Sequence, residues 1–160
     1  MKQLHWFGHA SFRVETDKGF NVYIDPWRLP PTAPKAGLVL LTHAHHDHCS
    51  AEDIAAIAGP ETVIAGPAQI RDALRQDTIV LAAGTDTLLC DIAIEPLPSY
   101  NIGKIFHPLQ AGNLGYIITV DGVRYYHAGD TDLIPEMTGL KTDYALLPIG
   151  GTYTMNPTEA

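Results

Sequence analysis

The chain has 160 residues, of which 46% are hydrophobic and 18% are charged. This composition is ordinary for a globular protein and excludes a long disordered chain, and the length suffices for one domain with a hydrophobic core. The 18 acidic residues outnumber the 10 basic ones, and the net charge of −8 argues against non-specific binding to nucleic acid. No stretch approaches the about 18 consecutive apolar residues of a membrane helix, so we expect no membrane contact.

The N-terminal residues lack the charged-then-apolar order of a signal peptide. Only two cysteines occur, Cys49 and Cys90, which give no disulfide framework of the kind that small secreted domains use. We therefore expect a cytoplasmic protein.

The first 42 residues predict four strands, because β-branched, aromatic and aliphatic residues gather in short runs between turn residues. Asp17-Lys18-Gly19 supplies a hairpin turn, and a proline-rich loop follows over residues 29–35. The run at residues 37–42 is continuously apolar, which is typical of a strand buried on both faces. The expected strands are residues 2–7, 10–16, 20–25 and 37–42.

Strands and helices alternate in the rest of the chain. Ser50 has the position of a helix N-cap, with Asp53 three residues later and Ile54 and Ile57 on one helical face. Such mixing predicts an α/β (α+β) fold with helices packed outside the sheets. The further strands expected are residues 61–65, 78–81, 87–97, 115–120, 123–127 and 144–147, and the further helices are residues 67–74 and 134–140.

Four of the eight histidines fall within residues 43–48, which read His-Ala-His-His-Asp-His. Alternate residues of an extended segment point the same way, so His43 and His45 can hold one metal ion. Imidazole and carboxylate ligands suit zinc, and also manganese or iron, better than calcium, and such a site can keep a position open for water. A solvated polar loop is the alternative, although chance rarely produces a cluster of this density.

The H-x-H-x-D-H segment after an apolar strand resembles the signature of the metallo-β-lactamase superfamily. The resemblance covers the whole chain in order, and it includes residues 8–12, 24–26, 126–132 and 147–155. These segments are similar to a branch of uncharacterised metal-dependent hydrolases that are similar to L-ascorbate-6-phosphate lactonase. The resemblance implies an αββα sandwich of the metallo-β-lactamase type and a metal-dependent hydrolase activity.

The resemblance also implies the metal ligands. His43 and His45 would bind a first ion, and Asp47 and His48 a second. His107 is the only histidine in the interval where the family's third ligand of the first ion lies. As a histidine before a proline, it has an ordinary surface residue as its alternative.

Further acidic and histidine residues follow from the same resemblance. Asp130 matches the carboxylate that bridges both ions, although an aspartate there would also suit a helix cap. Asp25 matches an acidic position that supports the ligands from behind, although before a proline it also reads as a turn residue. His9 and His127 are candidates for supporting or pocket positions. We expect no metal ligand at His5, His46 or Cys49.

This site implies hydrolysis. A divalent ion lowers the pKa of bound water toward neutrality, giving hydroxide near pH 7. Asp47 is the candidate catalytic residue, because it is placed to orient the nucleophile and to pass a proton to the leaving group. We expect a mono- or binuclear site, with Zn²⁺ first and Mn²⁺ or Fe²⁺ as alternatives, cleaving an ester, lactone, amide or phosphodiester bond of a small-molecule substrate.

Two other function classes stay open. One is a catalytically silent metal-binding chain that needs a partner chain to complete its site. The other is a di-iron redox domain, which the intact motif disfavours. Turnover by the metal-loaded protein separates the first of these from an enzyme.

The last part of the chain departs from the family pattern. The family takes a further metal-binding histidine from a late strand, and no histidine follows Asp130 in this sequence. Asn156-Pro157 has the character of a helix start, and Ala160 follows three residues later. We therefore hypothesise that residues 1–160 form a single metallo-β-lactamase-like domain that lacks its C-terminal part. Apolar surface left exposed by a missing layer would favour homo-oligomers.

Overall fold

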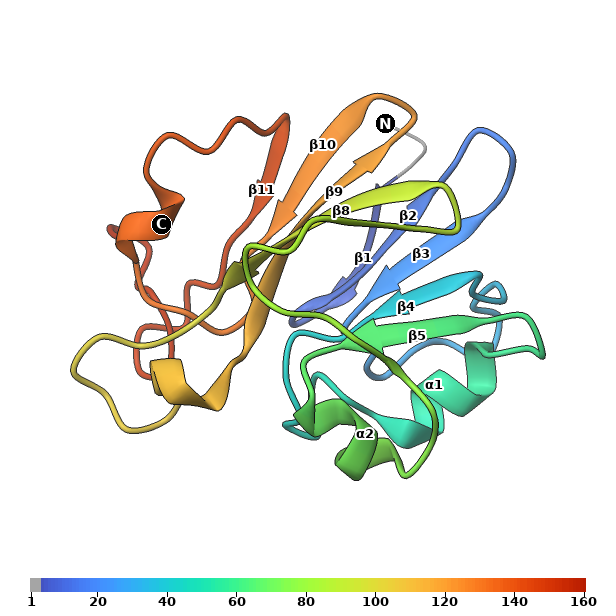
Figure 1. Ribbon diagram of the computed structural model, residues 1–160, viewed down its shortest axis with the longest axis horizontal. Helices are drawn as coiled ribbons and strands as arrows, with labels where there is room; N and C mark the ends of the chain where they lie inside the picture. Colours follow the sequence, from blue (N-terminus) through green and yellow to red (C-terminus); the bar gives the residue numbers. More distant parts are fainter. Residues whose placement is uncertain (1–3) are drawn as a thin grey trace. The chain divides into compact units, whose positions relative to one another are not determined.

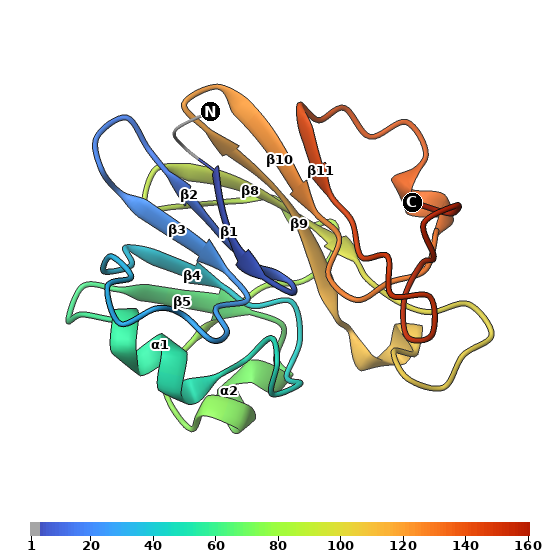
Figure 2. The same cartoon turned by 180° about the vertical axis from the view of Figure 1, so that it is seen from behind.

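The computed structural model describes residues 4–160, which form two compact units (Figures 1 and 2). Unit 1 contains the described residues up to Leu81 together with Leu89–Asp91, and unit 2 contains Ala82–Leu88 and Ile92–Ala160. Each unit is built on its own sheet, and helices are few, so the expected mixed α/β architecture is confirmed. The expectation of a single domain over the whole chain stays a prediction.

Unit 1 contains a six-stranded sheet in which strand order follows chain order. The first three strands are antiparallel neighbours, and the last three join in parallel. Parallel neighbours need crossover connections, and helices supply two of them here. The strands are β1 (Leu4–Gly8), β2 (Ser11–Glu15), β3 (Asn21–Ile24), β4 (Leu38–Leu40), β5 (Val63–Gly66) and β6 (Ile79–Val80).

The two crossover helices of unit 1 are α1 (Ala51–Ile57) and α2 (Gln69–Leu74), and both lie on the same side of β4 and β5 (Figures 1 and 2). Ser50 caps α1 as expected, because its hydroxyl accepts a hydrogen bond from the backbone N–H of Asp53 at 3.2 Å. The apolar face of α1 packs against the sheet and is almost fully buried. Each buried isoleucine of this kind contributes about 1.5–3 kcal/mol. The cluster includes Tyr23, Val39, Leu41, Ile54, Ile57 and Ile70.

Unit 2 contains a five-stranded sheet in the order β11-β10-β9-β8-β7. Its centre is an antiparallel meander of three strands, and the last strand of the chain joins β10 in parallel. Two short 3₁₀ helices interrupt the connections. The strands are β7 (Thr87–Leu89), β8 (Ile92–Pro98), β9 (Leu114–Val120), β10 (Val123–His127) and β11 (Tyr144–Leu146), and the 3₁₀ helices are η1 (Leu109–Ala111) and η2 (Pro135–Met137).

Two predicted elements are wrong in form. The run at residues 87–97 is two strands, because Cys90 and Asp91 both have positive φ and make a turn between them. The helix expected over residues 134–140 is only the 3₁₀ turn η2. Pro135 suits the start of such a turn, and Gly139, at φ +77°, bends the backbone out of helical geometry soon afterwards.

The expected helix start near the end of the chain has the hydrogen bonds of a capping box. The Asn156 side chain accepts from the backbone N–H groups of Thr158 and Glu159, and the Glu159 carboxylate accepts from the backbone N–H of Asn156 at 2.8 Å. Within residues 4–160, no helix has both the length and the apolar character needed to cross a bilayer.

Candidate metal centre

The histidine cluster follows the carboxyl end of β4, as expected from the sequence. All three residues of β4 are buried, and the chain then turns, so that the backbone N–H groups of His48 and Cys49 both donate to the carbonyl of His45. The turn brings His48 back beside His43, with ring centroids 4.1 Å apart. His43 and His48 are buried, whereas His45 is exposed.

Asp25 is fully buried directly behind this cluster, at the end of β3. β3 and β4 pair in parallel, with Ile24 opposite Leu40, so Asp25 and Thr42 end up at the same edge of the sheet. One carboxylate oxygen accepts the Thr42 N–H at 2.8 Å, and the other accepts the Thr42 hydroxyl at 2.6 Å and Nδ1 of His48 at 2.7 Å. Asp25 therefore supports the cluster with three hydrogen bonds.

These hydrogen bonds fix which nitrogen of each imidazole carries a proton. The Nδ1–H of His48 donates to the Asp25 carboxylate, which leaves Nε2 as its lone-pair nitrogen. Thr42 donates its one hydroxyl proton to Asp25, so its oxygen accepts from Nδ1 of His43 at 2.9 Å. His43 thus also presents Nε2, which lies 3.0 Å from Nδ1 of His45. An imidazole whose Nδ1 is engaged in this way can bind a metal through Nε2.

His9 lies against the same cluster from the β1–β2 connection. Its Nε2 is 3.4 Å from a carboxylate oxygen of Asp47, and its ring centroid is 5.0 Å from that of His48. His9, Asp47 and His48 each offer one ligand atom, and these atoms all lie within 4.8 Å of one another. Unit 1 therefore contains a group of three potential metal ligands.

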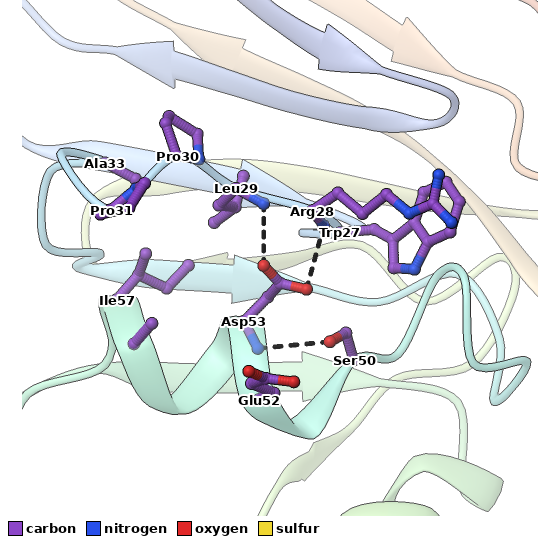
Figure 3. Close-up of a pocket in the computed structure, with 11 residues that line it drawn as sticks. Trp27, Arg28, Leu29, Pro30, Pro31, Ala33, Ser50, Glu52, Asp53 and Ile57 are labelled. Atoms are coloured by element: carbon purple, nitrogen blue, oxygen red, sulfur yellow. Dashed lines mark hydrogen bonds between the residues drawn. The ribbon is translucent and has the colours of Figure 1, made fainter.

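A pocket of about 460 Å³ lies beside this group, between α1 and the loop after β3 (Figure 3). The Asp53 carboxylate lines this pocket and accepts the backbone N–H groups of Arg28 and Leu29 at 3.0 and 2.8 Å. Trp27 lines the pocket, and its ring centroid lies 5.0 Å from that of His9. Trp27 therefore contacts His9 of the ligand group and also lines the pocket.

Unit 2 holds the other two candidate ligands, His107 and Asp130. His107 is buried, and its Nε2 lies 3.7 Å from a carboxylate oxygen of Asp130. Its Nδ1 lies 3.1 Å from the side-chain oxygen of Asn101, which also accepts the backbone N–H of His107. Because an amide oxygen only accepts, Nδ1 of His107 donates to Asn101, and Nε2 is the nitrogen that faces the Asp130 carboxylate.

The Asn101 amide is itself held in one orientation. Its Nδ2 donates to the Asp132 carboxylate at 3.2 Å and to the carbonyl of Tyr153 at 2.8 Å, so its oxygen must face His107. Asp132 in turn accepts from Nζ of Lys104 at 2.5 Å. A chain of buried and half-buried hydrogen bonds therefore positions His107.

The remaining candidates take other places. His127 is buried at the end of β10, and its Nδ1 accepts the backbone N–H of Gly129 at 3.2 Å. The His46 side chain is 90% exposed, and that of His5 is 42% exposed. Cys49 belongs to the core cluster of unit 1, and burial raises the pKa of its thiol to about 11, so the thiol is neutral near pH 7.

Three supporting residues were missed by sequence reasoning: Thr42, Asn101 and Asp132. Thr42 ends the predicted strand directly before the histidines, which is the one local signal for it. Asn101 lies six residues before His107 in an irregular loop and gives no such signal. Asp132 follows Asp130 within the motif that carried the resemblance, but only the fold brings it to Asn101.

Residues 3–160 match a family described as the beta-lactamase superfamily domain. Among curated relatives, the UPF0173 metal-dependent hydrolase of Thermococcus kodakarensis is 33% identical over 178 residues, which cover 100% of this chain and 77% of the relative. The protein of the same name from Methanobrevibacter smithii is 30% identical over 179 residues, covering 99% and 74%.

Solved structures similar to this chain are also described as metal-dependent or metallo hydrolases. A putative metal-dependent hydrolase from Parabacteroides distasonis superposes with a TM-score of 0.90 at 33% identity, covering 98% of this chain and 73% of that one. The metallo hydrolase Igni18 from Ignicoccus hospitalis gives a TM-score of 0.75 at 32% identity, covering 98% and 74%. The chain thus spans about three quarters of the length of these proteins.

Proposed function

The chain belongs to the beta-lactamase superfamily, and on that premise we propose that it is a metal-dependent hydrolase that cleaves an ester, lactone, amide or phosphodiester bond of a small molecule. The observation that carries the proposal is the arrangement of the imidazoles. In unit 1, the buried Asp25 and Thr42 engage Nδ1 of His48 and of His43, so Nε2 is the nitrogen that each ring can offer to a metal. Three buried hydrogen bonds hold this orientation, which a solvated polar loop without a ligand would not require.

The donor set fits a divalent ion of the zinc class. Zinc takes neutral imidazole nitrogen and carboxylate oxygen, and manganese and iron accept the same ligands. We propose His43, His45 and His107 as ligands of one ion and Asp47 and His48 as ligands of a second. Asp130 completes the proposed set as the carboxylate shared by both ions.

When bound, a divalent ion would lower the pKa of water and would polarise the carbonyl or phosphoryl oxygen of a substrate. The residues of the chain provide the rest. Asp47, whose side chain is 29% exposed, would accept a proton from the attacking water and pass it to the leaving group. Asp25 would keep His48 in place throughout, because it is buried and takes no part in proton exchange with the substrate.

Metal-loaded and metal-free protein, compared on lactones, thioesters and bis-(4-nitrophenyl) phosphate, test this function. We expect turnover of at least one substrate only with metal, and a loss of turnover by at least about 100-fold in Asp47→Asn. His5→Gln is the matched control, because His5 pairs with Glu15, belongs to none of the groups of potential metal ligands and should retain activity. Tight metal binding without turnover of any of these substrates would favour the catalytically silent alternative.

A further inference from the structure

The backbone around His9 is shaped to place this side chain. The β1–β2 register shifts between Trp6 and Gly8, which is a β-bulge, and bulges commonly re-aim a side chain. Gly8 has φ +104° and His9 has φ +50°, a conformation that non-glycine residues rarely adopt. The Trp6 indole N–H donates to the carbonyl of His9 at 2.9 Å and holds this conformation.

The His9 side chain lies against two ligand candidates, Asp47 and His48. Its Nε2 lies 3.4 Å from Asp47 Oδ2. A charge-assisted hydrogen bond between these groups would be about 2.7–2.9 Å long. Two ligand atoms on one tetrahedral zinc ion, with bonds of about 2.0–2.2 Å, lie about 3.4 Å apart. The two groups therefore lie close enough together to share one ion.

His48, the third member of the group, is held in one orientation by Asp25. Asp25 occupies Nδ1 of His48, so the remaining nitrogen of that ring is Nε2. The ring centroids of His9 and His48 are 5.0 Å apart, and one ligand atom from each of His9, Asp47 and His48 falls within 4.8 Å of the others. His48 is buried, whereas the side chains of His9 and Asp47 are 37% and 29% exposed. The group is thus backed by the core and open toward solvent.

We propose that His9 is the third protein ligand, with Asp47 and His48, of one divalent ion of the zinc class. This inference rests on the proposed function and deepens it, because it assigns that ion three ligands from unit 1 alone. A supporting role for His9 is the competing interpretation: it would donate one hydrogen bond to Asp47 and touch no metal. The two roles respond differently to a change of His9 to glutamine.

The test is a zinc titration of metal-free protein against a coloured chelator, with Co²⁺ absorption as a second readout of ligand number. The wild type is compared with His9→Gln, His9→Asn, Asp47→Asn and the control His5→Gln. Glutamine keeps an N–H donor for Asp47, and asparagine tolerates positive φ, so the fold at this position is retained in at least one variant. Circular dichroism of the metal-free variants checks folding.

We expect both His9 variants to weaken one zinc site by about 100-fold, as Asp47→Asn does, and to alter the Co²⁺ spectrum, whereas His5→Gln binds like the wild type. Wild-type affinity and spectrum in His9→Gln, together with a lost site in Asp47→Asn, would overturn the ligand role of His9 and leave the proposed function standing. A wild-type chain that binds no zinc or cobalt would overturn both.

Discussion

Replacing Asp25 with asparagine changes the charge and donor pattern behind the histidine cluster with almost no change of shape. The carboxylate accepts three hydrogen bonds, from the N–H and hydroxyl of Thr42 and from Nδ1 of His48. Asparagine offers an oxygen on one side and an NH₂ group on the other, so at least one of these donors would face another donor. Asparagine also tolerates φ +47°, which makes this substitution cleaner than alanine.

The magnitude follows from the burial of Asp25, which has no solvent-exposed surface. One buried donor left without an acceptor costs about 1–3 kcal/mol, so the free energy of unfolding of the metal-free protein should fall by that amount. If the amide NH₂ faces His48, its Nδ1 must become the acceptor and its Nε2 must carry the proton. Zinc affinity should then fall by about 10–100-fold, or about 1.4–2.7 kcal/mol.

Urea unfolding of metal-free protein and competitive zinc titration measure both effects. Nitrogen-15 NMR of the imidazoles should report Nδ1–H at His48 in the wild type and Nε2–H in Asp25→Asn. Asp77→Asn, a change of the same kind at an exposed position, should alter none of these quantities. Unchanged stability, affinity and tautomer in Asp25→Asn would refute the reasoning.

Three further predictions concern other parts of the molecule. Asn101→Ala removes the acceptor that holds Nδ1 of His107, and we expect zinc affinity to fall by about 10–100-fold in the same titration. Asp53→Ala removes the acceptor of two backbone N–H groups, and urea unfolding should show a loss of about 2 kcal/mol. Burial raises the pKa of Cys49 from 9.0 to about 11, so its stabilising contribution is complete below about pH 9 and is lost as the pH rises through about 11. The difference in unfolding free energy between wild type and Cys49→Ala should shrink over that range. Below it, iodoacetamide should modify the exposed Cys90 first, and equal rates at both cysteines would contradict the burial of Cys49.

The sequence was sufficient to predict the parts of the site that depend on local order. The apolar run before His43 and the cap at Ser50 depend only on neighbours in the chain, and both have the expected form. The support from Thr42 is different, because its hydroxyl matters only where β3 and β4 pair in parallel and bring Asp25 to it across 17 residues. The spacing of residues along the chain does not predict the contact between Thr42 and Asp25.

Unit 2 illustrates the same limit. The orientation of His107 depends on Asn101, and the orientation of Asn101 depends on Asp132, which lies 31 residues further along the chain. The incorrect helix at residues 134–140 has a local origin, since Pro135 begins only a 3₁₀ turn and Gly139 has a positive φ soon afterwards. Hydrophobic spacing predicts burial better than it predicts the backbone conformation that achieves it.

The central claim is that unit 1 presents Asp47 and His48 to a divalent ion with Asp25 behind them. Anomalous diffraction at the zinc absorption edge, from a crystal of the zinc-loaded protein, measures this directly. The account predicts an anomalous peak about 2.0–2.2 Å from Nε2 of His48 and from the carboxylate of Asp47. The absence of an anomalous peak at that position, or Nε2 of His48 turned away from any ion, would contradict it.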